Sequence, residues 1–170
     1  MIILGIDPGV ISTGYGAIKI KDGKESLVDF GVITIERERE LPARLSGIYD
    51  GITALCRKLQ PDALAIEEIF FSKNARTAIT VGHTSAAVIL AAGHQGVEVS
   101  TYTPLQIKQM VSGYGRADKT QMQRIVQVIL KLEKVPQPDH AADALAVALC
   151  HYYISRTTPK LKATKWSDNR

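Results

Sequence analysis

Residues 1–35, MIILGIDPGVISTGYGAIKIKDGKESLVDFGVITI, decide the fold of this chain. Segments at 1–7, about 14–20 and 26–35 are rich in Ile, Val, Tyr and Phe, and glycine-containing turns such as DGK at 22–24 separate them. Such residues between turns are typical of strands, and short turns join antiparallel neighbours. The stretch therefore predicts a three-stranded antiparallel meander.

Helices and strands are predicted to alternate after the meander. Apolar residues at three- and four-residue steps, a buried apolar run, and the capping pair Asp118 and Gln121 mark these elements. The predicted helices are at 41–59, at about 73–94, one that begins at 104, one that follows residue 118, and one at about 138–156. The predicted strands are at 61–68 and 96–102. The pattern predicts an α/β fold with a mixed five-stranded sheet, three antiparallel then parallel strands, flanked by helices. We assign 1–156 to one domain and 157–170 to a basic, flexible C-terminal tail.

Length and composition fit one globular domain. The chain has 170 residues, 45% hydrophobic and 22% charged, and no stretch approaches the ~20 uncharged apolar residues of a membrane helix. The N-terminus lacks the charged region and cleavage site of a signal peptide, so export is not expected. Cys56 and Cys150 lie far apart in predicted helices and are expected to be buried thiols, not a disulfide or zinc site.

Charge is distributed unevenly along the chain. The net charge of +4 comes from residues 155–170, where five Lys or Arg residues stand against Asp168 alone. Residues 1–70 carry eight basic and eleven acidic groups, whereas 71–134 carry eight basic and three acidic ones. A basic region beside an acidic one suits a protein that meets phosphates with one surface and holds metal cations with another.

Three acids occupy positions where a carboxylate needs a partner. Asp7 ends the first predicted strand, Glu67 ends a buried strand, and Asp143 lies on an otherwise apolar helix. A buried lone charge costs on the order of several kcal/mol, and His140 shares a helical face with Asp143. Each acid alone is also explained by a helix cap or an ion pair. Together they favour a site for hard cations such as Mg²⁺ or Mn²⁺.

Four short motifs occur in a fixed order along the chain. They are GIDPG with TGYG at 13–16, AIEE with Phe70, QIKQ at 106–109, and HAADALA at 140–146. Each is short, but the ordered set resembles the pattern of the RuvC Holliday junction resolvase family over about residues 1–156. The resemblance implies a ribonuclease H-like fold and a crossover junction endodeoxyribonuclease that makes paired, symmetric nicks in four-way DNA junctions during recombination and repair.

The resemblance also implies the residues of the active site. Asp7, Glu67, His140 and Asp143 take the catalytic and metal-binding positions, with two Mg²⁺ ions per site, for which Mn²⁺ can substitute. Asp7 is expected to be shared between the ions, and metal-activated water is the implied nucleophile for in-line hydrolysis.

One position departs from a common form of the pattern. His140 stands where many members of the family have aspartate, although others have histidine, and Asp139 immediately precedes it. Adjacent helical residues are rotated by about 100°, so Asp139 is expected to point away from Asp143 unless the helix start is distorted. Whether His140 or Asp139 faces the metal stays open at this stage.

Phe70, Arg76, Lys108 and Lys119 are the predicted DNA contacts. The aromatic ring of Phe70 is suited to stacking on a base exposed at the junction, and the alternative is an aromatic core residue. Lys108 and Lys119 match basic positions of the family, where they would bind the backbone near the scissile phosphate. Arg76 has less motif support, and general attraction to phosphates explains it equally well.

The resemblance further implies a homodimer, the branch-migration proteins RuvA and RuvB as partners, and a place in the bacterial cytoplasm. Small residues along 73–94 suit either a dimer contact or close packing on the protein's own sheet. Three other functions remain as alternatives: an actin-like ATPase or sugar kinase fragment, which this length argues against; a junction-binding module without catalysis; and a nuclease of the same fold acting on flaps or RNA.

Overall fold

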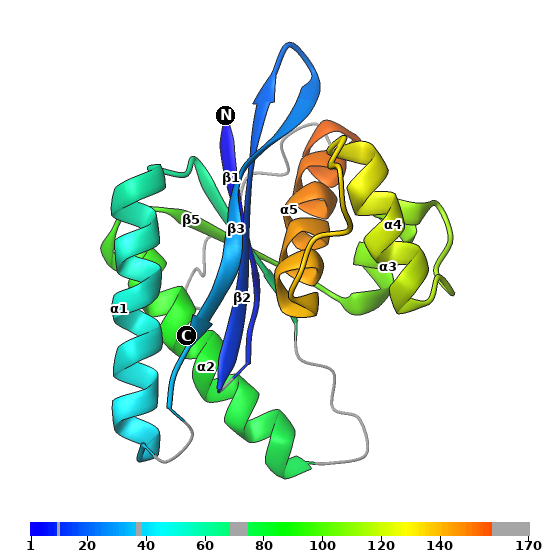
Figure 1. The fold of residues 1–170 in the computed structure, drawn as a ribbon. Helices are drawn as coiled ribbons and strands as arrows, with labels where there is room; N and C mark the ends of the chain where they lie inside the picture. The colour runs from blue at the N-terminus through cyan, green and yellow to red at the C-terminus, as the bar shows by residue number, and fades with distance from the viewer. Residues whose placement is uncertain (10, 37–38, 69–74, 158–170) are drawn as a thin grey trace, which may run out of the picture.

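The computed structural model describes residues 1–9, 11–36, 39–68 and 75–157, with the backbone alone at 75–77. Five strands and five helices occur in these ranges (Figure 1). In chain order they are β1 (Ile2–Asp7), β2 (Ser12–Lys21), β3 (Lys24–Thr34), α1 (Leu41–Leu59), β4 (Ala63–Glu67), α2 (Ala75–His94), β5 (Glu98–Tyr102), α3 (Pro104–Ser112), α4 (Lys119–Ile129) and α5 (Asp139–Thr157).

The strands form one mixed sheet in the order β3-β2-β1-β4-β5. β1, β2 and β3 pair antiparallel, whereas β4 runs parallel to both β1 and β5. This confirms the predicted α/β class, the five-stranded sheet and the initial meander. β2 begins at Ser12, earlier than the predicted start at about 14, because Ser12 pairs with Thr34 at the far end of β3.

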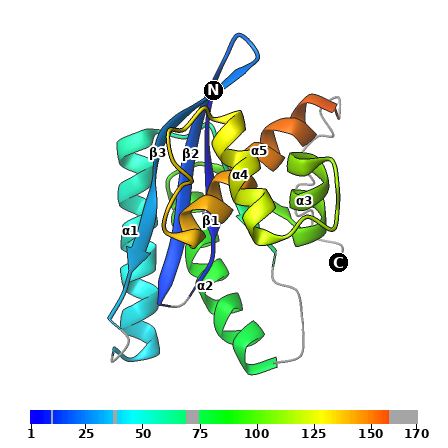
Figure 2. The same cartoon turned by 45° about the vertical axis from the view of Figure 1, so that its right-hand side comes forward.

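Helices cover both faces of the sheet. α1 and α2 lie on one face, while α5 lies on the other with α3 and α4 outside it (Figures 1 and 2). Alternation along β1 serves both layers, since Leu4 and Ile6 pack towards α1 and α2 whereas Ile3 packs towards α5. Asp7 has the same parity as Ile3 and therefore faces the α5 layer.

The starts of α3 and α4 follow local capping chemistry. Asp118 and Gln121 form the predicted capping box at α4, with backbone-to-side-chain distances of 2.8 and 3.0 Å. Thr103 and Gln106 form a second capping box at α3, ahead of Pro104, which the sequence analysis did not identify. Fixed starts orient the first turns of α3 and α4, which border the cavity described below.

α5 lies unusually close to the sheet. A Cβ atom added to Gly5 of β1 would collide with the backbone of Ala144 and Ala148, and one added to Gly14 of β2 would collide with the backbone of His140. Alanines in α5 complete this approach, and most of the helix is buried. The two glycines thus set how near the first turns of α5 come to the end of β1.

Other features agree with the sequence analysis. Cys56 and Cys150 are free and buried, as expected. None of the helices in the described ranges has the length and apolar character needed to span a bilayer. The tail was predicted at 157–170, but Thr157 is the last residue of α5. Residues 158–170 lie outside the described residues, so the flexibility of the tail stays a prediction.

Gly5→Ala is expected to lower the free energy of unfolding by roughly 2 kcal/mol, because the added methyl group meets backbone that cannot move independently. The free energy is measured by urea denaturation followed by circular dichroism. Gly93→Ala is the matched control: Gly93 is an exposed residue of α2 with open space around its Cβ position. In a helix this change should be neutral or stabilising by about 0.5–1 kcal/mol. Equal effects of the two substitutions would contradict the close approach.

Candidate metal centre

Two strand ends bring acids to the same edge of the sheet. Register pairs Ile6 of β1 with Ile66 of β4, so the next residues, Asp7 and Glu67, end two neighbouring parallel strands. Strand alternation turns both towards the α5 layer, since Ile6 and Ile66 face α1 and α2. Fold and register therefore place two of the predicted site residues side by side.

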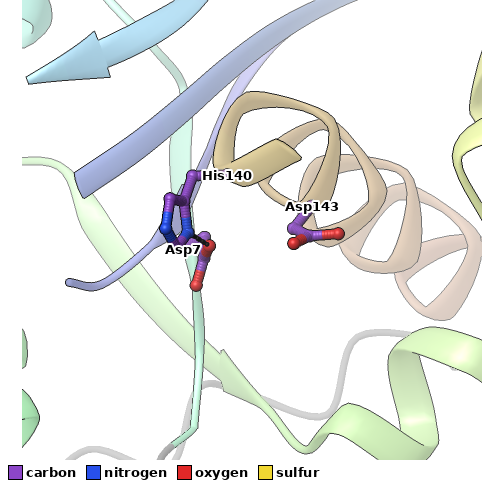
Figure 3. Close-up of side chains that lie close together, drawn as sticks. All are labelled: Asp7, His140 and Asp143. Carbon is purple, nitrogen blue, oxygen red and sulfur yellow. Dashed lines mark hydrogen bonds and ion pairs between the residues drawn. The ribbon is translucent and has the colours of Figure 1, made fainter. Parts of the chain in front are cut away.

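α5 contributes the other two predicted residues. His140 Nδ1 lies 2.6 Å from Asp7 Oδ2, although these residues are 133 positions apart in the chain. Asp143 follows one turn later, and single ligand atoms of Asp7, His140 and Asp143 all lie within 4.8 Å of one another. Figure 3 shows Asp7 and His140 close together beside the start of α5, with Asp143 one turn further along the helix.

Glu67 borders this trio without belonging to it. The carboxylate lines a cavity of about 200 Å³ together with Asp143, Lys108 and Lys119. Burial, followed by the charges of Asp7 and Asp143, raises the pKa of Glu67 to about 7. The four predicted residues are thus gathered in one region, but as a tight group of three with Glu67 at its edge.

The negative charges of the site oppose one another. Burial is the main cause of the raised pKa of Asp143; the charge of Asp7 adds to it, and that of Lys119 acts against it. The ordinary response of a carboxylate cluster to such repulsion is protonation or cation binding. Carboxylate oxygens and an imidazole nitrogen at this spacing fit a divalent cation, with hard ions such as Mg²⁺ and Mn²⁺ favoured by the oxygens.

Lys119 is the cation that contacts this cluster most directly among the described side chains. Its Nζ lies 3.1 Å from Asp139 Oδ2 and 3.3 Å from Asp143 Oδ2. Burial disfavours the ammonium, but the hydrogen bonds and charges of these two acids outweigh it and raise the pKa of Lys119. Lys108, the other predicted lysine, borders the same cavity as Lys119.

The positions of Asp139 and His140 differ in an informative way. His140 contacts Asp7, whereas Asp139 contacts Lys119 on the α4 side of α5. The expectation that Asp139 would point away from Asp143 was wrong, because residues four apart lie on the same helical face and both acids reach Lys119. The geometry favours His140, not Asp139, as the partner of Asp7 in a metal site.

The remaining predictions concern DNA contacts. Phe70 lies outside the described residues, and Arg76 is described only by its backbone in α2, so neither contact is tested. Glu68, the neighbour of Glu67 in the chain, is exposed. Gln123 was not among the predicted site residues, and its Nε2 donates to Asp139 Oδ1 at 2.9 Å. Its place four residues after Lys119 was the available signal.

Comparisons with known proteins agree with the motifs. Residues 3–151 match the family described as Crossover junction endodeoxyribonuclease RuvC. The protein of that name from Ruminiclostridium cellulolyticum is 50% identical, over 89% of this chain and 91% of its own length. The one from Syntrophomonas wolfei is 45% identical over the whole of both chains.

Solved structures give the same result. Thermus thermophilus RuvC in complex with Holliday junction substrate aligns with a TM-score of 0.88 and 35% identity, covering 92% of this chain and 96% of that one. A yeast mitochondrial Holliday junction resolvase, at 14% identity and a TM-score of 0.62 over 87% of this chain and 76% of that one, shares the fold.

Glu67→Gln is expected to stabilise the metal-free protein at pH 8 by roughly 2 kcal/mol, a value discounted for the part of the side chain that water reaches. The folded pKa lies above the unfolded one, so the folded state holds the extra proton. Wild-type stability should therefore fall as pH rises from about 4.5 through 7. A neutral Gln has no such loss, so the two proteins should converge below pH 4.5.

Urea denaturation in chelator across this pH range measures the difference. Glu68→Gln removes the neighbouring, exposed carboxylate and serves as the control. Parallel pH profiles of the free energy of unfolding for wild type and Glu67→Gln would show that the pKa of Glu67 is not raised in the folded protein.

Proposed function

The chain belongs to the RuvC family of crossover junction endodeoxyribonucleases, and we propose that it resolves four-way DNA junctions by paired, symmetric hydrolysis of phosphodiester bonds. The observation that carries the proposal is the Asp7–His140–Asp143 group, whose ligand atoms lie within 4.8 Å of one another. Asp143 of this group also lines a cavity together with Glu67, Lys108 and Lys119. This is the donor set and charge pattern of a metal-dependent nuclease.

The site residues divide the proposed work between them. Asp7, His140 and Asp143 would hold a divalent cation, and Glu67, whose pKa is raised by the charges of Asp7 and Asp143, would help Asp7 to hold a second one. Mg²⁺ is the proposed ion, two per site, and Mn²⁺ substitutes because it accepts the same oxygen ligands. When bound, the ions neutralise charge and polarise the scissile phosphate.

The lysines act on the phosphate itself. Lys108 and Lys119 lie at the cavity that Glu67 and Asp143 also line, so their ammonium groups meet a DNA backbone that enters it. An ammonium near the scissile phosphate holds it in place and offsets the charge that develops during cleavage. Phe70 and Arg76 are proposed to contact the junction beyond this cavity, through base stacking and phosphate binding.

Paired cuts need two active sites, so a homodimer is proposed as the working form. α2 carries the exposed apolar side chains of Ile79, Ile89 and Leu90, which support a dimer interface on the exposed side of this helix. RuvA and RuvB are the proposed partners, and the bacterial cytoplasm is the proposed location because chromosomal junctions form there. Residues 1–156 form the proposed nuclease domain, with a basic tail at 157–170 that adds attraction to DNA.

Asp7→Asn is expected to reduce junction cleavage by at least 100-fold while leaving folding and junction binding intact, because it removes ligand charge at nearly constant size. Cleavage is measured on a labelled four-way junction beside linear duplex and flap DNA, with Mg²⁺, Mn²⁺ or chelator. Asp22→Asn, in the β2–β3 turn, is the control and should cut normally; its positive φ of 52° suits asparagine.

Other outcomes separate the alternatives. Symmetric, metal-dependent nicks confined to the junction support the resolvase function. Tight binding without cutting by wild type would indicate a silent junction-binding module. Cutting of flaps or duplex in preference to junctions would indicate another nuclease of this fold, and normal cutting by Asp7→Asn would refute the role of Asp7.

A further inference from the structure

The first turns of α4 and α5 face each other through four polar side chains. Lys119 and Gln123 are four residues apart on α4, and Asp139 and Asp143 are four residues apart on α5. Lys119 contacts both acids, at 3.1 and 3.3 Å, and Gln123 donates to Asp139 at 2.9 Å. Each helix thus presents a pair of side chains to the pair on the other.

Asp143 has competing demands in this arrangement. It is a member of the tight group with Asp7 and His140, and it also forms an ion pair with the ammonium of Lys119. A divalent cation held by that group attracts the Asp143 carboxylate more strongly than a singly charged ammonium does, and it repels the ammonium. The contact between Lys119 and Asp143 is therefore expected to weaken when a cation binds there.

Asp139 has no such conflict. It lies outside the group of three that could hold a cation, and its two oxygens accept from Lys119 and Gln123 separately. The hydrogen bond from Gln123 fixes the orientation of the carboxylate. Asp139 also begins α5, where the positive end of the helix dipole favours an acid.

Lys119 needs an anchor for two reasons. Its long side chain is about half exposed and loses rotamer entropy when it is held in one place. It is also the first residue of α4, where the dipole disfavours a positive charge. Neighbouring carboxylates are what hold the ammonium at the cavity despite both effects.

We propose that Asp139, oriented by Gln123, is a positioning residue that keeps the Lys119 ammonium at the cavity when Asp143 is engaged by the metal. Lys119 then remains available to the scissile phosphate. In this role Asp139 acts through Lys119 and is not itself a metal ligand. This inference rests on the proposed nuclease function and adds to it a residue whose role is separate from metal binding.

The test uses the full chain and a labelled four-way junction under single-turnover conditions. Asp139→Asn should slow cleavage at saturating Mg²⁺ about 10-fold, with the Mg²⁺ concentration for half-maximal rate unchanged. Mn²⁺ binding measured by calorimetry, and junction affinity measured in Ca²⁺, should match wild type within about twofold. Gln123→Leu, which removes only the orienting hydrogen bond, should slow cleavage by a smaller factor.

A double-mutant cycle separates positioning from a general structural role. In the Lys119→Met background, Asp139→Asn should cause no further loss, because the residue through which it acts is gone. Single-turnover reactions followed over hours allow the slow rates to be compared. Glu133→Gln, an exposed acid between α4 and α5, controls for the loss of one negative charge and should cut like wild type.

Each contrary outcome has a definite meaning. An unchanged cleavage rate in Asp139→Asn overturns the inference while leaving the nuclease function intact. A slow rate restored by excess Mg²⁺, with weakened Mn²⁺ binding, would make Asp139 a metal ligand instead. Additive losses in the cycle would show that Asp139 acts independently of Lys119. Failure of wild type to cut any junction would overturn the proposed function itself.

Discussion

The close contact between α5 and the sheet is the constraint on which the rest of the structure depends. Gly5 and Gly14 leave no side chain between the strands and the backbone of α5, so the helix rests directly on β1 and β2. The same contact buries much of α5 and brings His140 within 2.6 Å of Asp7. Core packing and site geometry are therefore set by one interface.

The charges of the site follow from that geometry. Helix and sheet meet closely enough to bring Asp7, Glu67 and Asp143 into mutual repulsion, which burial strengthens. Two lysines at the cavity moderate this repulsion without removing it. Such a site is costly for folding alone, and the stability of the surrounding layers supports it.

Much of this arrangement could be predicted from the sequence. The meander, the capping box at Asp118 and the helix from Leu41 to Leu59 follow from local patterns, and the structure confirms them. Motif order identified the four residues that gather at the site. Their division into a tight trio with Glu67 at its edge could not be predicted, since it depends on where α5 settles across the sheet. The contact of Asp139 with Lys119 depends on how α4 packs against α5, which no local pattern specifies.

The order of the elements along the chain has a consequence for biosynthesis. A ribosome completes β1 and β4, with Asp7 and Glu67, well before it reaches α5, the last element in the described part of the chain. Until α5 emerges, one face of the sheet lacks its central cover, and two of the three residues of the candidate metal group, His140 and Asp143, are missing. A nascent chain that has not yet reached α5 therefore lacks the candidate metal centre, because the helix that closes the core also completes that centre.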